Sequence, residues 1–143
     1  MDRLTSDTID EIEGAREPDP DPDVTNVIRR CLALRRKPLS QFTTEDLRLM
    51  LGQQIAVPIL LPMAVAVLAD DPLAEGDYYP GDLLYAVVRL PESAWLSAAH
   101  DRDRLVEALR ATQVPNGDVY ADLRRAIAAF VDSSPSEHNE PSA

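Results

Sequence analysis

The chain has 143 residues, of which 45% are hydrophobic, and its formal net charge is −11 at pH 7. This length suits one domain with a hydrophobic core and is too short for two domains of ordinary size. Cys31 is the only cysteine, which excludes an intramolecular disulfide. The first ten residues contain acids where a signal peptide needs an apolar run, so we expect a cytoplasmic protein.

Most of the negative charge lies at the two ends of the chain. Residues 1–23 have a net charge of −7 and residues 133–143 a net charge of −2. The first segment contains EPDPDPD, where alternating proline and carboxylate disfavour both helix and strand. We predict an acidic, proline-rich N-terminal arm over 1–23, a domain over 24–132 and a disordered tail over 133–143. Within the arm, Leu4, Ile9 and Ile12 have the spacing of a short docked helix.

The stretch that follows the arm has helical periodicity. Apolar residues from Val24 to Leu32 form one stripe, which ends in the basic cluster 29–37. Thr43 and Asp46 have the spacing of a capping box, with Asp in place of the usual Glu, and they predict the start of the next helix.

The rest of the chain shows the same period. Further helices are expected at 57–69, 101–112 and 118–132, and no alternating strand pattern with hairpin turns is present. The predicted fold class is therefore all-α: a single compact helical domain of about five to eight helices. A helical domain with a small hairpin near residues 70–84 is the alternative.

A membrane span needs to be considered because residues 49–69 carry no charge. Their continuous apolar part, 55–69, is shorter than the roughly 20 residues that cross a bilayer. We therefore predict a buried core helix and no membrane partner.

Residues 70–84, DDPLAEGDYYPGDLL, hold five carboxylates and two adjacent tyrosines without a basic residue. Asp71 before Pro72 is typical of a turn, and Gly76 is expected to supply a positive φ. The acids do not follow the calcium-loop spacing and no histidine accompanies them, so neither a metal site nor a catalytic pair is predicted. The segment is then either a structured turn alone or a turn that is also a docking surface. The candidate set for docking has seven residues: Asp70, Asp71, Glu75, Asp77, Tyr78, Tyr79 and Asp82.

Other signs of chemistry are weak. His100 and His138 have no ligand partners at metal-binding spacing, and Cys31 lies on the apolar stripe of its helix. Neither a nucleophile elbow nor a glycine-rich phosphate loop is present, so we expect no enzyme activity and no cofactor. The basic cluster 29–37 leaves one alternative function, a helical regulator that binds nucleic acid or another protein.

Several segments together resemble a known family. LRRKPLSQFTTEDLRLMLGQQI, LLPMAVAVLADDPLAEGDYYPGDLL and PESAW are similar, in this order, to immunity proteins of contact-dependent growth inhibition (CDI) systems, and IDEIEG matches a weaker early motif. The resemblance implies a non-enzymatic cytoplasmic protein that binds the C-terminal toxin domain of one effector and blocks its active site. Several such toxins are nucleases, which present basic clefts to nucleic acid. The acidic residues between 70 and 82 are then expected to face the toxin, with no direct contact to nucleic acid.

Overall fold

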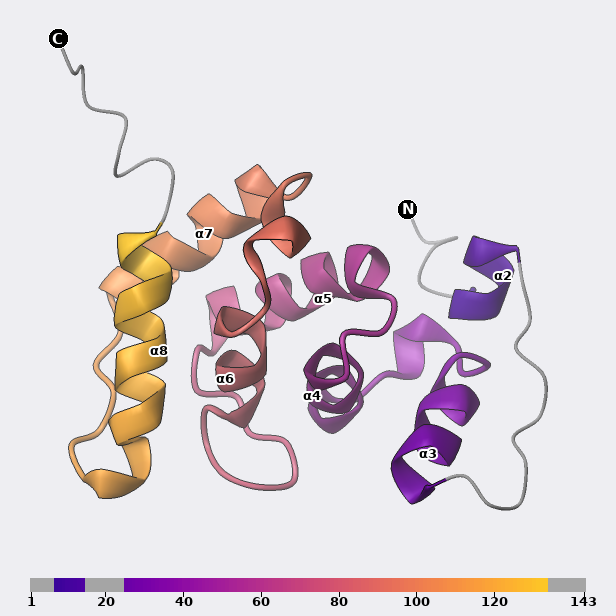
Figure 1. The fold of residues 1–143 in the computed structure, drawn as a ribbon, viewed down its shortest axis with the longest axis horizontal. Coiled ribbons are helices and arrows are strands. Elements are labelled where there is room, and N and C mark those ends of the chain that lie inside the picture. Colours follow the sequence, from indigo (N-terminus) through magenta and orange to yellow (C-terminus); the bar gives the residue numbers. More distant parts are fainter. Residues whose placement is uncertain (1–6, 15–24, 134–143) are drawn as a thin grey trace, which may run out of the picture.

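Helices make up the fold in the computed structural model, which describes residues 7–14 and 25–133. These residues form seven α-helices and three short 3-10 helices, and they contain no strand (Figure 1). One isolated antiparallel bridge, between Glu75 and Pro80, is the β-type pairing found within them. The predicted all-α class is confirmed, in place of the alternative with a hairpin.

The N-terminal half contains α2 (Ile9–Glu13), α3 (Asn26–Leu34), η1 (Leu39–Gln41) and α4 (Thr44–Gly52). The capping box at the start of α4 is confirmed: the Thr43 hydroxyl accepts from the Asp46 N–H at 3.1 Å, and the Asp46 carboxylate accepts from the Thr43 N–H at 3.0 Å. These bonds satisfy two donors that a helix start leaves unpaired.

The short helix α2 docks beside the end of α3. Ile9 is fully buried, and the Asp10 N–H donates to the Arg35 carbonyl at 3.1 Å. A short helix thus lies within the predicted arm over Ile9–Glu13, whereas Leu4 lies outside the described residues. The remainder of the arm and residues 134–143 lie outside the described residues, so the predicted linker and tail stay predictions.

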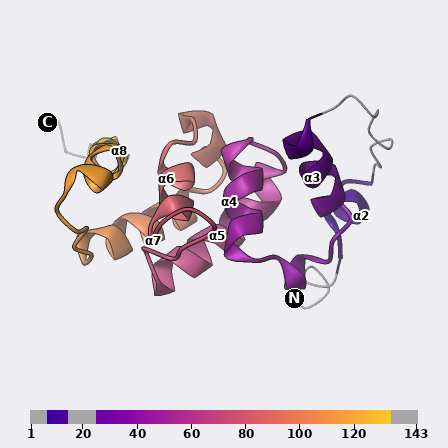
Figure 2. The same ribbon diagram turned by 90° about the horizontal axis from the view of Figure 1, so that it is seen from below.

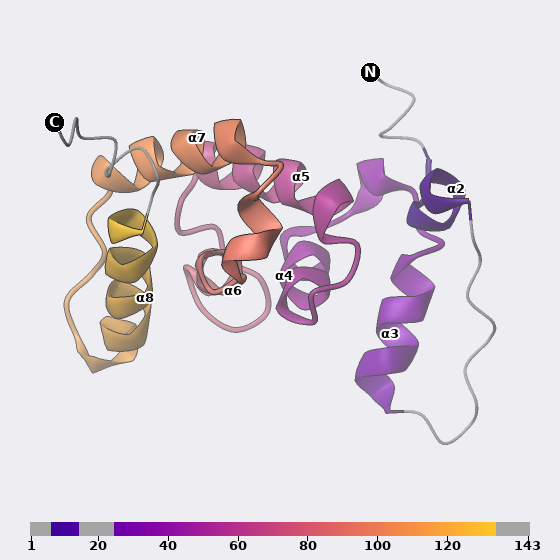
Figure 3. The same cartoon turned by 45° about the horizontal axis from the view of Figure 1, so that its top comes forward.

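The second half contains α5 (Val57–Asp70), α6 (Asp82–Val88), η2 (Glu92–Trp95), α7 (Ala99–Arg110), η3 (Asp118–Tyr120) and α8 (Ala121–Asp132). α4 packs against α5 and α6, α5 packs against α7, and α6 packs against α8. α3 and α8 consequently lie at opposite ends of an elongated helical layer (Figures 2 and 3). The core between them includes the fully buried Met50, Leu60 and Leu83.

The apolar helix α5 starts from an unusual backbone. Its N-cap residue, Ala56, has a φ of 54°, and the helix continues through Pro62. A non-glycine residue with positive φ is strained, because its Cβ crowds the backbone. No helix within the described part of the chain is long and apolar enough to cross a membrane.

Candidate functional site

The predicted docking segment forms the connection between α5 and α6, and a buried carboxylate organises it. Asp82, the first residue of α6, is 4% exposed. Its carboxylate accepts from the N–H of Gly76 at 2.7 Å, of Tyr78 at 3.0 Å and of Tyr79 at 3.5 Å. Hydrogen bonds from backbone N–H groups compensate the desolvation of a buried charge. Asp82 therefore fixes the loop from inside and does not present its carboxylate to a partner.

Glu45, near the start of α4, binds the same loop from a second side. Its Oε1 accepts from the Asp77 N–H at 2.9 Å, and Arg48 forms a bidentate pair with it at 2.7 and 2.6 Å. The hydrogen bonds from Arg48, helped by the Asp77 N–H and opposed by burial, hold the pKa of Glu45 below its usual value. Glu45 is thus a charged anchor between α4 and the loop.

Gly76 has a different role from the predicted one. It has no positive φ, whereas Gly81 has a φ of 97°, so the expectation for Gly76 is wrong. A Cβ on Gly76 would lie 2.6 Å from Glu45 Oε1 and 3.1 Å from Asp82 Oδ2. Glycine is required because the backbone passes between the two anchoring carboxylates.

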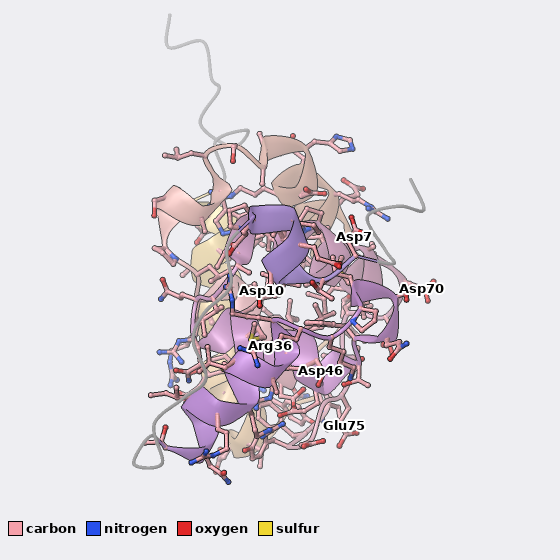
Figure 4. The ribbon with its side chains drawn as sticks, turned by 90° about the vertical axis from the view of Figure 1, so that its right-hand side faces the viewer. Asp7, Asp10, Arg36, Asp46, Asp70 and Glu75 are labelled. Carbon is pink, nitrogen blue, oxygen red and sulfur yellow. The ribbon has the colours of Figure 1, made fainter. Side chains whose placement is uncertain are left out.

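The exposed side of the loop carries most of the other candidate residues. Asp70, Asp71, Glu75 and Asp77 are exposed, and Figure 4 places Glu75 at the lower edge of the molecule, away from Asp70. The acids are therefore spread over the loop instead of converging on one point. Within the described residues, no group of three or more His, Cys, Asp or Glu could hold a metal ion.

The adjacent tyrosines take different positions. Tyr78 is 68% exposed, and the guanidinium carbon of Arg48 lies 4.6 Å from its ring centroid. This cation–π contact orients the ring while leaving it open to a partner. Tyr79 is half-buried, and burial, followed by the neighbouring Tyr85 and Asp82, raises its pKa. Tyr78 is the tyrosine that is positioned to act as an anchor.

The basic cluster 29–37 is largely engaged with acids. Arg35 is buried and pairs with Asp10 at 2.8 Å and with Glu13. Burial alone would lower the pKa of Arg35, but the hydrogen bonds to the two acids raise it overall. The other paired cations are Arg36 with Asp10 at 3.8 Å, Lys37 with Asp46 at 2.6 Å and Arg30 with Glu45 at 4.0 Å.

The acids in these pairs come from two elements, α2 and α4. Figure 4 shows Arg36 between Asp10 of α2 and Asp46 of α4. Cations already matched by carboxylates have less to gain from phosphate, so the arrangement weighs against the nucleic-acid alternative. Cys31 is buried, and desolvation raises the pKa of its thiol, which disfavours the reactive thiolate.

Sequence reasoning missed two residues of this site, Glu45 and Arg48. Their i, i+3 spacing on a predicted helix favours an ion pair. Nothing in that spacing connects them to Asp77 and Tyr78, which follow about thirty residues later in the chain.

The fold is all-helical among the described residues, and its acidic loop is held by Asp82 and Glu45. A family model described as CDI immunity proteins matches residues 11–105. The chain belongs to this family of CDI immunity proteins, and its general function is therefore to neutralise a toxin. No curated protein matches the chain.

Proposed function

We propose that this protein binds its cognate toxin domain through the loop between α5 and α6 and occludes a basic active site, as a nuclease would present. The observation that carries the proposal is the separation of roles in the loop. Asp82 and Glu45 hold its backbone, while the side chains of Glu75, Asp77 and Tyr78 remain exposed.

A surface held in its binding conformation loses little conformational entropy on association. The exposed carboxylates of the loop carry negative charge into solvent, where they attract a cleft lined by Lys and Arg. Because such a cleft is built to bind phosphates, carboxylates that enter it compete with the nucleic acid. Asp70 and Asp71 add to this negative charge. The half-buried Tyr79 and the buried Asp82 contribute by holding the loop in place from its inner side.

Binding to the cognate toxin domain provides the test. Glu75→Gln with Asp77→Asn is expected to slow association about tenfold at low salt and to flatten the salt dependence, because exposed charges act mainly by steering. The matched control is Asp103→Asn with Asp118→Asn, which removes the same charge from exposed positions on α7 and η3. If the control pair slows association equally, the effect comes from net charge, and the loop is not the binding surface.

Tyr78 gives a second measurement at the same surface. Truncation to Ala is expected to weaken toxin binding by about 2 kcal/mol, as for a hot-spot tyrosine, while thermal melting stays unchanged because the ring is exposed. A lower melting temperature with unchanged affinity would make the loop a scaffold. The alternative function, a helical regulator that binds nucleic acid, predicts a different result. In that case the free chain would bind DNA or RNA in a salt-sensitive manner, and changing Arg29, Arg30 and Arg36 to Gln would abolish this binding.

A further inference from the structure

The first turn of α3 exposes apolar side chains that the core does not use. Val27 is 38% exposed and Ile28 is 47% exposed, whereas Cys31 and Leu34, farther along the same helix, are buried. The apolar stripe that packs α3 onto α4 therefore continues past the edge of the core. An amphipathic helix whose apolar face extends beyond its intramolecular contacts has surface available for another molecule.

A series of contacts around Glu45, on α4, connects α3 to the acidic loop. Arg30, two residues after Ile28, lies 4.0 Å from Glu45 Oε2. Glu45 in turn binds the Asp77 N–H, and its partner Arg48 stacks on Tyr78. In Figures 1 and 2, α4 accordingly lies between α3 and α6.

The composition of the chain limits what can cover this turn. Residues 15–24, which lead into α3, have only Ala15 and Val24 as apolar residues besides proline, and residues 134–143 have only Ala143. Met1 and Leu4 precede α2, which docks beside the other end of α3. A second copy would bring its own acidic loop and a further net charge of −11 toward the first, which opposes self-association. The same negative charge favours a basic protein.

We propose that Val27 and Ile28 form the apolar half of the toxin-binding surface, next to the acidic half in the loop. This inference rests on the proposed function. The fitting partner is a toxin domain with an apolar patch beside its basic cleft. Apolar contacts desolvated at the centre of an interface mainly set the dissociation rate, whereas exposed carboxylates mainly set the association rate. The two halves consequently have separate kinetic signatures.

The test uses the full chain and its cognate toxin domain. Ile28→Gln keeps a good helix former at the position and removes the exposed apolar side chain. We expect it to speed toxin dissociation about tenfold, which corresponds to about 1.4 kcal/mol, with an unchanged association rate. Ile28→Leu is expected to restore slow dissociation.

The matched control is Val119→Gln, which removes an apolar side chain that is 74% exposed in η3, at the other end of the molecule from α3 (Figure 1). Equal dissociation rates for the two Gln variants would overturn the inference while leaving the proposed function intact. Failure of the wild-type chain to bind the toxin would overturn both.

Two measurements on the free chain test whether another part of this chain, or a second copy of it, covers the turn. Ile28→Gln should leave the melting temperature unchanged; a clear decrease would show that another part of this chain covers the turn and would overturn the inference. Sedimentation velocity should show a monomer for both wild type and variant. A dimer that the variant dissociates would assign the turn to self-association instead.

Discussion

Asp82 and Arg102 are both buried charges, at 4% and 3% exposure, but they stabilise different kinds of structure. Asp82 accepts hydrogen bonds from the backbone of one loop. Arg102, on α7, donates to Glu92 at 3.1 and 3.0 Å and to Ser133 at 2.7 Å.

The surroundings of Arg102 are also aromatic. Its guanidinium carbon lies 5.0 Å from the Phe130 ring centroid and 5.8 Å from that of Trp95, and the two rings are 5.1 Å apart. Arg102 therefore joins η2, α7 and α8 through side chains. The comparison shows that the Asp82 carboxylate holds the main chain of one loop, whereas the Arg102 guanidinium holds η2, α7 and α8 together.

The largest expected effect is on stability at the C-terminal end. Arg102→Ala removes the side chain that fills the space beside two aromatic rings, and it should lower the free energy of unfolding by about 3 kcal/mol. Urea denaturation measures this loss. Arg104→Ala, an exposed arginine on the same helix, is the control and should stay within about 0.5 kcal/mol of wild type. Equal losses in the two variants would contradict the role of Arg102 in packing.

A smaller effect is expected in the loop. Asp82→Ala leaves buried N–H groups of the loop without their acceptor and should cost about 2 kcal/mol. Amide hydrogen exchange should accelerate at Gly76 and Tyr78 before global unfolding, which distinguishes it from Arg102→Ala. Asp82→Asn keeps one acceptor oxygen and should show a smaller change in both measurements. Exchange that accelerates equally throughout the chain would contradict a local role.

The pH dependence of stability separates the second loop anchor from general charge effects. Since the folded-state pKa of Glu45 is lowered, its carboxylate stabilises the fold above its unfolded pKa of about 4.3, and this contribution disappears as the pH falls through the folded-state value. Glu45→Gln should therefore cost about 1 kcal/mol at pH 7, and this cost should shrink as the pH falls below the unfolded pKa. Denaturation along a series of falling pH values, beside the exposed-residue control Glu107→Gln, tests this; a cost that stays constant as the pH falls would refute it.

The smallest expected effect lies outside both regions, at a residue whose backbone conformation is strained. Ala56 adopts a φ of 54° at the start of α5. Ala56→Gly relieves the crowding of Cβ and should raise the free energy of unfolding by about 0.5 to 1 kcal/mol, net of the greater entropy that glycine has in the unfolded chain. A gain in melting temperature without altered toxin binding is the expected result. Destabilisation would show that the methyl group contributes packing that outweighs the strain.

Local patterns predicted the helices well because their causes are local. The Thr43 and Asp46 capping box and the helix expected over 118–132 depend on residues three or four positions apart. Both occur, the helix as α8 over Ala121–Asp132. The connection between α5 and α6 also occurs where the composition of residues 70–84 predicted a turn.

The contacts that organise the loop were not predictable in the same way. Glu45 reaches Asp77 across 32 positions, and Asp10 reaches Arg35 across 25, so only the tertiary fold brings these charges together. The same limitation explains Asp82 and Gly76. A carboxylate in an acidic run looks solvent-exposed until the surrounding backbone is known, and a glycine required for space cannot be told from one required for its φ.

The way the loop is held has a consequence for how binding preference can change. The anchoring carboxylates bind the backbone N–H groups of residues 76–79, and every peptide unit other than one before proline offers such a group. The side chains at positions 75 and 77 can therefore be exchanged, including for residues of opposite charge, without loss of the anchors. If the loop binds the toxin as proposed, mutation at these two positions offers a route by which one helical scaffold acquires a different toxin partner.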